Sequence, residues 1–203
     1  MKETICRYMR RLCDMGLTTS LGGNISCLDE ETGQILVTPS GIDKYSLTPE
    51  DLVTVDRDGR VVSGDRKPTM EYMMHVGIYQ ARPEMRAVVH AHPPFASLYA
   101  CLNEPIDTTL TLEFCKSVGE IGMVDLEIMG TPELADLVKE SARTHRVMLM
   151  RNHGPVTCGR TLQEAFNLLE LTEMAAKLTW LARGHDVCPV PASVQAVLRT
   201  MRK

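Results

Sequence analysis

The sequence predicts a layered α/β domain with a mixed, largely antiparallel sheet. Three observations predict it. Segments with helical and strand periodicity alternate along the chain, tight polar turns join two pairs of short strands, and no linker, repeat or low-complexity tract divides the 203 residues. Alternation is typical of layered folds, and hairpins require antiparallel pairing. The length fits one large domain, so we expect a single domain over residues 1–203.

The first half of the chain is expected to form a helix, two hairpins, a second helix and a strand. Ile5, Met9 and Leu12 recur at helical spacing, and Gly16 follows as a stop signal. Polar turns separate short apolar runs, as hairpins require, and Pro68 opens the second helix as a first-turn proline. The expected ranges are a helix at 3–15, strands at 25–28, 34–38, 52–56 and 60–63, a helix at 68–81 and a strand at 87–92.

The second half has two clear helix starts. Thr131-Pro132-Glu133 combines a hydroxyl cap, a first-turn proline and an acid near the helix dipole. Thr161 and Glu164 have capping-box spacing and begin a long helix that should end at Gly184. The other expected elements are a helix at 96–102, a strand-rich region at 108–129, a buried strand at 146–150 and a basic helical tail after residue 186.

The bulk composition excludes several classes of partner. The formal net charge is −4 and the pI is about 5.9, so no basic excess indicates binding to nucleic acid or to an anionic membrane. No apolar stretch is long enough to span a bilayer, and the first residues lead into a charged amphipathic segment and not into a signal peptide. The seven cysteines contain no Cys-x-x-Cys pair, which favours reduced thiols. We therefore expect a cytoplasmic protein.

Three histidines are candidate metal ligands. His90 and His92 lie two apart in an expected strand, so both side chains project from the same face. His153 follows an apolar strand at a tight turn, which is a usual location for a functional side chain. Three imidazoles with one open position describe a catalytic zinc site. The alternative is that all three are ordinary hydrogen-bonded or turn residues.

One carboxylate and several turns complete the set of candidate residues. Glu71 is expected in the first turn of its helix, where the helix dipole alone would favour an acid. Beside a metal it could instead ligate the ion when substrate is missing and act as a base when substrate is bound. The turns at 21–24 and 38–41, with Thr69 at a helix start, could cradle an anion, although most such turns only reverse the chain.

Five motifs, taken in order and spacing, resemble the class II aldolase/adducin family. The resemblance extends over residues 5–185, which makes it far more specific than any single motif. The family includes aldolases, epimerases and dehydratases of sugar phosphates, and also the non-enzymatic adducin head. The motifs are Gly-Gly-Asn-Ile-Ser (22–26), Thr-Pro-Ser-Gly (38–41), Lys-Pro-Thr-Met-Glu (67–71), Val-Val-His-Ala-His (88–92) and Asn-His-Gly (152–154).

The resemblance implies a three-layer α/β/α fold around a nine-stranded sheet, and a homotetramer with active sites between subunits. It implies one zinc ion per subunit, bound by His90, His92 and His153. It also implies that Glu71 is the acid/base and a further ligand in the absence of substrate. Mn²⁺ or Co²⁺ would suit the same imidazoles. The implied phosphate-binding residues are Gly23, Asn24, Ser40, Gly41 and Thr69.

Two departures from the family pattern bear on substrate and mechanism. The aldolases usually carry Ser-Ser-Glu where this chain has Thr69-Met70-Glu71, and Met70 cannot donate a hydrogen bond to phosphate. Tyrosines of the later half, which the fuculose-phosphate enzymes use, have no counterpart after Tyr99. Glu113 is therefore a candidate second catalytic group, because dehydratase relatives use a glutamate in about that region.

These residues predict a zinc-dependent lyase. We expect a small phosphorylated sugar as substrate, a (deoxy)ketose 1-phosphate such as L-fuculose 1-phosphate. Cleavage through a metal-stabilised enediolate would yield dihydroxyacetone phosphate and an aldehyde. The same site would also serve a pentulose-phosphate 4-epimerase or a methylthioribulose-phosphate-type dehydratase. An adducin-like binding module is the non-enzymatic alternative, which the presence of all three histidines and Glu71 argues against.

Overall fold

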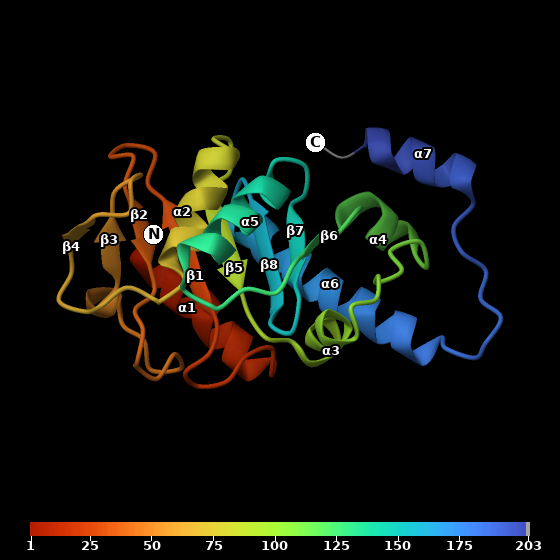
Figure 1. Ribbon diagram of the computed structural model, residues 1–203, viewed down its shortest axis with the longest axis horizontal. Helices are drawn as coiled ribbons and strands as arrows, with labels where there is room; N and C mark the ends of the chain where they lie inside the picture. The colour runs from red at the N-terminus through yellow and green to blue at the C-terminus, as the bar shows by residue number, and fades with distance from the viewer. Residues whose placement is uncertain (202–203) are drawn as a thin grey trace.

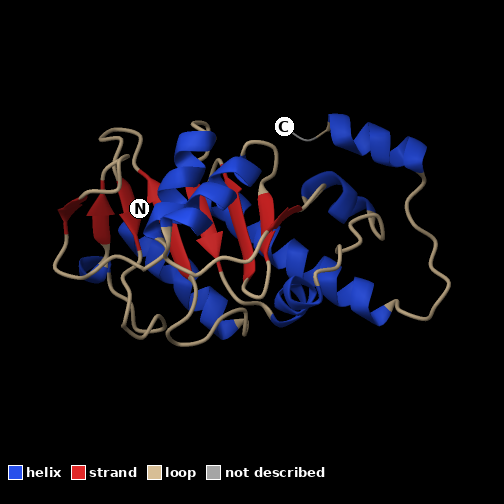
Figure 2. Cartoon of the chain, in the orientation of Figure 1, coloured by secondary structure: helices blue, strands red, loops and turns tan. Residues whose placement is uncertain are grey.

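The computed structural model describes residues 1–201 and contains one sheet with helices on both faces (Figures 1 and 2). Its first half comprises α1 (Lys2–Asp14), β1 (Asn24–Leu28), β2 (Ile35–Val37), a 3₁₀ turn (Pro49–Asp51), β3 (Val53–Val55), β4 (Val61–Ser63), α2 (Tyr72–Ala81) and β5 (Ala87–His90). Its second half comprises α3 (Pro94–Leu102), α4 (Leu112–Ser117), β6 (Gly122–Val124), α5 (Pro132–Ala142), β7 (Val147–Met150), β8 (Gly154–Gly159), α6 (Leu162–Leu181) and α7 (Ala192–Thr200).

The sheet is mixed and largely antiparallel, as the sequence predicts. Its eight strands have the order β4-β3-β2-β1-β5-β8-β7-β6, and only β6 and β7 run parallel. The described residues thus form eight strands where the family resemblance implies nine. The register sets Asn24 of β1 opposite His90 of β5, and Met150 of β7 opposite Gly154 of β8. One end of the central strands therefore gathers Asn24, His90 and the turn at 151–153.

Helices cover the two faces of the sheet through side chains that alternate along each strand. Val88 and Met148 face a cluster formed with α2 and α5. Val89 faces a cluster with α1 and the start of α6, while Leu149 faces α3, α4 and the rest of α6. The fold is therefore a three-layer α/β/α arrangement. Figure 1 also shows α7 beyond α4, reached from α6 by an extended segment.

Two element boundaries near the candidate residues differ from the expected ones. The helix expected from Pro68 begins at Tyr72, because the preceding residues instead bind the turn at 38–41. The Thr69 N–H donates to the Thr38 carbonyl at 3.0 Å, and Pro68 forms an isolated bridge with Pro39. The strand expected at 87–92 ends at His90. The His92 N–H leaves the sheet and donates to the Leu17 carbonyl at 3.0 Å.

Two further elements were not predicted. The region at 108–129 contains a helix, α4, where strands are expected; Thr111 caps it by accepting a hydrogen bond from the Phe114 N–H. The strand β8 contains Pro155, a residue that argues against a central strand. Pro155 is tolerated because its carbonyl, and not an N–H, is what the neighbouring residues use. None of the helices in residues 1–201 combines the length and apolar character needed to cross a lipid bilayer.

Candidate metal and active site

The candidate site lies where β5 ends, beside the turn that joins β7 to β8. His90 is the last residue of β5, and His92 follows it two residues later. His153 lies in the turn, next to Asn152, whose backbone has a positive φ of 55°. Asparagine tolerates this left-handed conformation better than most residues, so the tight turn can form. The structure therefore brings together the three histidines that the sequence identifies.

The three imidazoles point their nitrogens at a common point. The Nε2 atoms of His90 and His92 are 3.1 Å apart, and each of the three rings offers a nitrogen within 4.8 Å of the others. The Nδ1–H of His90 donates to the Pro155 carbonyl at 2.9 Å, which leaves the Nε2 lone pair free to bind a cation. Two nitrogens bound to one tetrahedral zinc ion would lie about 3.3–3.4 Å apart. The donor set fits a metal ion.

Glu71 faces this cluster from the start of α2. It occupies the N-cap position of α2, whereas the sequence predicts it within the first turn of the helix. Its two carboxylate oxygens each lie 3.4 Å from an imidazole Nε2, that of His90 and that of His153. Glu71 is buried, and its Oε1 has no hydrogen-bond partner within residues 1–201. A buried carboxylate oxygen with no partner is costly, so this oxygen is suited to receive a metal or a proton from a ligand.

Burial opposes charge on every titratable group of the site. It lowers the pKa of His90 and His92 and brings the pKa of His153 to about 4, so all three rings are neutral near pH 7. Burial raises the pKa of Glu71, but His90, His153 and a hydrogen bond from Asn24 lower it more, and the net pKa is below its ordinary value. Neutral imidazoles and an ionised carboxylate are the protonation states that a divalent cation requires.

A chain of buried hydrogen bonds orients Glu71, and the sequence did not identify it. Asn24 Nδ2 donates to Glu71 Oε2 at 2.9 Å, and His75 Nε2 donates to Asn24 Oδ1 at 2.5 Å. His75 Nδ1 then accepts from the Ser26 hydroxyl at 2.7 Å, and Ser26 in turn accepts from Tyr79 at 2.8 Å. This chain fixes the Asn24 amide with its N–H toward Glu71. No local pattern in the sequence indicates this chain, because Asn24, which joins Glu71 to His75, is 47 and 51 positions away from them.

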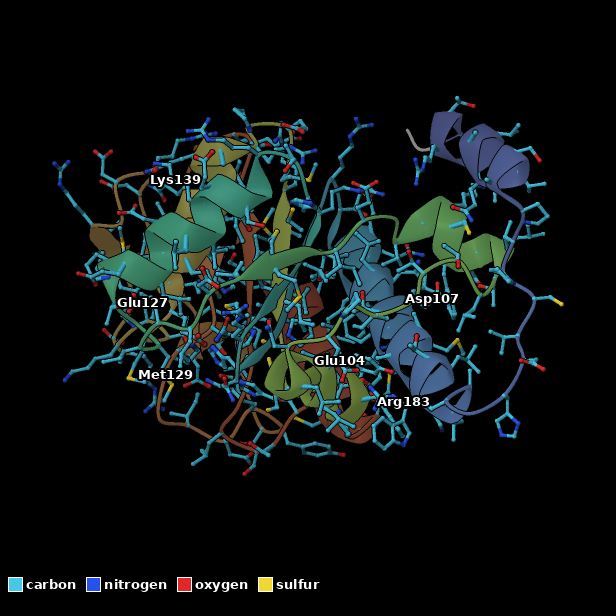
Figure 3. All side chains as sticks on the ribbon, turned by 45° about the vertical axis from the view of Figure 1, so that its right-hand side comes forward. Glu104, Asp107, Glu127, Met129, Lys139 and Arg183 are labelled. Atoms are coloured by element: carbon cyan, nitrogen blue, oxygen red, sulfur yellow. The ribbon has the colours of Figure 1, made fainter. Side chains whose placement is uncertain are left out.

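A cavity of about 400 Å³ lies beside the three histidines and Glu71. Gly23 lines this cavity and has a positive φ of 68°. A Cβ atom added at Gly23 would lie 3.0 Å from the carbonyl oxygen of His90. Met129, in the segment between β6 and α5 (Figure 3), adds an apolar contribution. The residues that line the cavity are Leu21, Gly22, Gly23, Asn24, Ser40, Gly41, Lys44, Thr69, Met70, Glu71, His92, Met129 and His153.

The lining includes every residue for which the sequence suggests phosphate binding, and it excludes Glu113. Glu113 is exposed in the first turn of α4, where the helix dipole favours an acid, and it is not part of this cavity. The structure of one chain thus does not bring Glu113 to the histidines. Lys44 is the reverse case, because it lines the cavity although no sequence motif singles it out.

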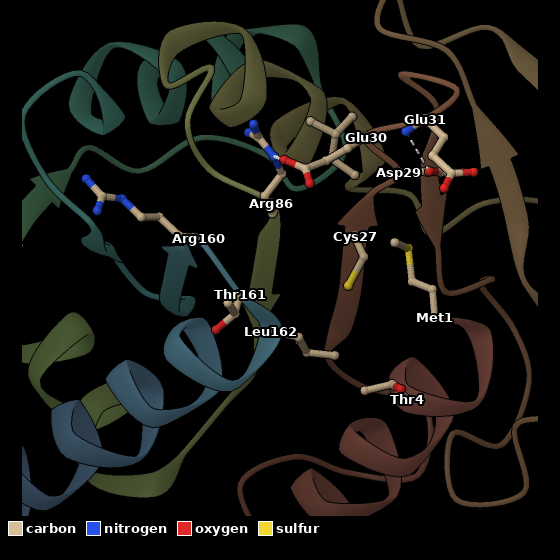
Figure 4. A pocket seen from close by; sticks show the side chains of 11 residues that line it. Met1, Thr4, Cys27, Asp29, Glu30, Glu31, Arg86, Arg160, Thr161 and Leu162 are labelled. Carbon is tan, nitrogen blue, oxygen red and sulfur yellow. Dashed lines mark hydrogen bonds and ion pairs between the residues drawn. The ribbon is translucent and has the colours of Figure 1, made fainter.

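A second cavity, of about 490 Å³, lies at the opposite end of the central strands (Figure 4). It is bordered by the end of β1, the start of β5 and the start of α6. Arg86 at its rim is already paired with Glu30. None of the residues that the sequence identifies as site candidates lines it. We therefore assign the chemistry to the cavity beside the histidines.

The chain resembles known proteins over almost its whole length. It matches the family described as Class II Aldolase and Adducin N-terminal domain over residues 3–180. It is 33% identical to the 5-deoxy-D-ribulose 1-phosphate aldolase of Bacillus thuringiensis serovar kurstaki, with 90% of this chain and 85% of that protein covered. It is 32% identical to the 3-oxo-tetronate 4-phosphate decarboxylase of Escherichia coli O6:H1, with 98% and 95% covered. A solved structure of L-fuculose 1-phosphate aldolase has a TM-score of 0.91 at 32% identity, with 98% and 94% covered.

Proposed function

The chain belongs to the class II aldolase and adducin family, and on this premise we propose that it is a zinc-dependent aldolase. Its substrate would be a (deoxy)ketose 1-phosphate such as L-fuculose 1-phosphate, and its products dihydroxyacetone phosphate and an aldehyde. One observation carries the proposal. Three imidazoles and the Glu71 carboxylate converge from separate elements at the edge of a cavity of about 400 Å³.

His90, His92 and His153 would hold the ion, with Glu71 as a further ligand when no substrate is present. Mn²⁺ and Co²⁺ are alternatives, because imidazole binds all three. Bound there, the ion would act as a Lewis acid that polarises the substrate ketone and stabilises negative charge on its oxygens. The Pro155 carbonyl supports this role by holding His90 in the tautomer that leaves its Nε2 available.

Glu71 would move the proton at the carbon next to the ketone. In the direction of condensation, its carboxylate removes a proton from that carbon of dihydroxyacetone phosphate and leaves an enediolate, which attacks the aldehyde. In cleavage, water accepts the proton of the C4 hydroxyl, the bond between C3 and C4 breaks to release the aldehyde and leave the enediolate, and protonated Glu71 gives its proton to C3; a proton from water then restores protonated Glu71. The lowered pKa of Glu71 supports the ionised form with which condensation begins.

Asn24 and the two turns would position the substrate. Gly23, Asn24, Ser40, Gly41 and Thr69 line the cavity together with the metal-site residues, as a phosphate site next to the reacting carbons requires. The proposed assembly is a homotetramer with the sites between subunits. Glu113, which is exposed on α4, has a part in this proposal only if a neighbouring subunit supplies it.

The test is a cleavage assay on purified, zinc-loaded protein. L-fuculose 1-phosphate and 5-deoxyribulose 1-phosphate are incubated with the protein, and triose phosphate is measured with a coupled dehydrogenase. We expect dihydroxyacetone phosphate from at least one of them. The absence of product from both, in protein that contains a full equivalent of zinc, would refute this substrate assignment.

Decarboxylation is a second candidate function, favoured by the similarity to 3-oxo-tetronate 4-phosphate decarboxylase over 98% of this chain. In that compound C3 is the ketone, so loss of C1 as carbon dioxide leaves an enediolate between C2 and C3. Protonation at C2 then gives dihydroxyacetone phosphate, the same product as in the aldol reaction. The two functions differ in the fragment that leaves. Release of carbon dioxide from 3-oxo-tetronate 4-phosphate, without cleavage of either ketose phosphate, would favour this reading.

A further inference from the structure

Lys44 is a buried cation without an acidic partner. The residue is 2% exposed, and its Nζ donates a hydrogen bond to the Pro39 carbonyl. Among residues 1–201, no carboxylate forms an ion pair with it. Burial is the main cause that lowers its pKa. A buried ammonium whose hydrogen bond is to a neutral carbonyl is costly, because its lost hydration is not repaid by an opposite charge. Such a group is suited to receive an anion.

The ammonium is folded back onto the turn that the sequence identifies as a possible anion cradle. Lys44 follows Gly41 by three residues, and the carbonyl that its Nζ contacts directly precedes Ser40. Lys44 also lines the cavity that contains Thr69 and Glu71. Among the described residues that line this cavity, it is the single lysine or arginine, and Glu71 is the single acid. An anionic group of a ligand is therefore attracted to Lys44 and repelled by Glu71.

Two backbone N–H groups beside the cavity are already committed to other hydrogen bonds. The Ser40 N–H donates to the Lys67 carbonyl at 3.1 Å, and the Thr69 N–H donates to the Thr38 carbonyl at 3.0 Å. The Met70 side chain contributes no donor. An anion here therefore needs donors other than these two N–H groups, and the Lys44 ammonium is one such donor. The Lys44 N–H, bound to the Ser20 carbonyl at 2.7 Å, fixes the start of its side chain.

We infer that Lys44 binds the phosphate dianion of the substrate and makes the site select phosphorylated over unphosphorylated ketoses. This inference rests on the proposed function for its substrate class, but phosphate binding itself does not depend on catalysis. The charge of the ammonium would replace the hydrogen bond that Met70 cannot make. Burial lowers the pKa of Lys44 to about 8, so the group is still mostly protonated at pH 7.

The test measures the affinity for inorganic phosphate by calorimetry on zinc-loaded wild type, Lys44→Met and Lys67→Met. Lys67 is exposed and lies outside the cavity, so its variant loses the same charge without the contact. We expect phosphate binding to weaken about 10- to 100-fold in Lys44→Met, as for a lost charge-assisted hydrogen bond. In Lys67→Met it should change less than about twofold. Failure of the wild type to bind phosphate, or equal affinities in all three proteins, would overturn the inference.

Thermal unfolding separates this role from a structural one. Removal of a buried unpaired charge should leave the phosphate-free Lys44→Met protein at least as stable as the wild type, and phosphate should raise the Tm of the wild type more. A Lys44→Met protein that is destabilised but binds phosphate with unchanged affinity would indicate a purely structural lysine and refute the proposal. Should Lys44→Met fail to fold, Lys44→Gln provides the same comparison.

The cleavage assay distinguishes failure of this inference from failure of the proposed function. A wild type that binds phosphate through Lys44 but cleaves no ketose phosphate would refute the aldolase assignment and support the anion site. A Lys44→Met protein that cleaves the ketose phosphate with unchanged KM, and still discriminates against the free ketose, would refute the anion site and leave the aldolase assignment intact.

Discussion

At the scale of single residues, the position of Glu71 is decided by one amide. Asn24 donates to Glu71 Oε2, which leaves Oε1 without a partner in the described chain and directed at the cluster of histidines. The carboxylate therefore has one oxygen fixed by the protein and one available to a ligand. This division suits a group that must exchange between binding a cation and carrying a proton.

Replacement of the carboxylate should separate catalysis from metal binding. Glu71→Gln keeps the shape and the hydrogen bond but cannot carry the proton, so we expect kcat for cleavage to fall about 10²- to 10⁴-fold. The three histidines should still retain zinc, measured by atomic absorption. Glu133→Gln, an exposed glutamate at the start of α5, serves as the control and should behave as wild type. Substantial cleavage by Glu71→Gln would refute the acid/base role.

His75 should act on catalysis through Asn24 alone. His75→Phe keeps the ring volume but loses the hydrogen bond to Asn24, so the amide can rotate and Glu71 loses its orientation. We expect kcat to fall about tenfold with the zinc content unchanged, and stability to fall by about 1–3 kcal/mol. His75→Gln, which restores a donor, should recover part of kcat. The exposed His185 provides the control variant His185→Phe. An unchanged kcat in His75→Phe would contradict this positioning role.

The same histidine makes stability depend on pH. Burial lowers the pKa of His75 to about 3, whereas in the unfolded chain it is about 6.5. As the pH falls below about 6.5, the unfolded chain binds a proton that the folded chain does not. The contribution of neutral His75 is therefore complete above pH 6.5 and is lost progressively toward pH 3. Denaturant titrations should show a smaller loss between pH 7 and pH 4 in His75→Gln than in wild type.

At the scale of elements, the pairing of β1 with β5 aligns the site. Asn24 lies opposite His90, so the residue that orients the carboxylate and a proposed metal ligand are cross-strand neighbours. Gly23 precedes β1 and allows the close approach, because a side chain there would collide with the Thr18 hydroxyl at 2.9 Å and with the His90 carbonyl at 3.0 Å. The glycine is needed both for its positive φ and for this space.

A pair of glycine variants separates these two needs. Gly16, at the end of α1, has a φ of 66° against 68° at Gly23, but a side chain there would meet nothing within 4 Å. Gly16→Ala should therefore cost about 1–2 kcal/mol from backbone strain alone. Gly23→Ala should cost at least about 1 kcal/mol more and should weaken zinc binding, because His90 must move. Equal losses of stability in urea titrations would argue against the close contact.

The sequence could predict the local features of this site but not the contacts made between distant segments. The two-residue period of a strand identifies the shared face of His90 and His92, and the turn after an apolar strand identifies His153. The role of His75 depends on Asn24, 51 positions away, and that of Lys44 on burial within a loop, so neither leaves a local pattern. The helix α4 was wrongly predicted as strand because the Thr111 cap was overlooked. The strand β8 was not predicted because Pro155 argues against a central strand.

At the scale of the whole molecule, the proposed ion would connect separate parts of the chain. His90 ends β5 and His92 follows it outside the sheet, His153 lies in the turn before β8, and Glu71 lies at the start of α2. Residues 71 and 153 are distant in sequence, so a metal that joins them stabilises the folded chain and not the unfolded one. Binding of metal and global stability are thus linked.

Removal of metal should therefore abolish activity and lower stability together. At a free zinc concentration about 1,000 times Kd, binding contributes about 4 kcal/mol, which corresponds to roughly 10 °C in Tm for a chain of this size. Differential scanning calorimetry with and without a chelator measures the shift, and addition of zinc should reverse it. A variant with His92→Ala should show a much smaller shift. A Tm that does not respond to the chelator, in protein shown to have contained zinc, would contradict the proposed linkage.

The two ends of the central strands differ in function, so one end is available for a label that leaves the candidate site unchanged. The three histidines and Glu71 lie at the end where Asn24 meets His90, while the hairpin that joins β1 to β2 turns at the other end through the exposed residues 30–32. A fluorophore or an affinity peptide inserted into that hairpin would be far from the histidines along the strand direction. Such a label would allow substrate binding to be followed in solution without disturbing the groups that perform the reaction.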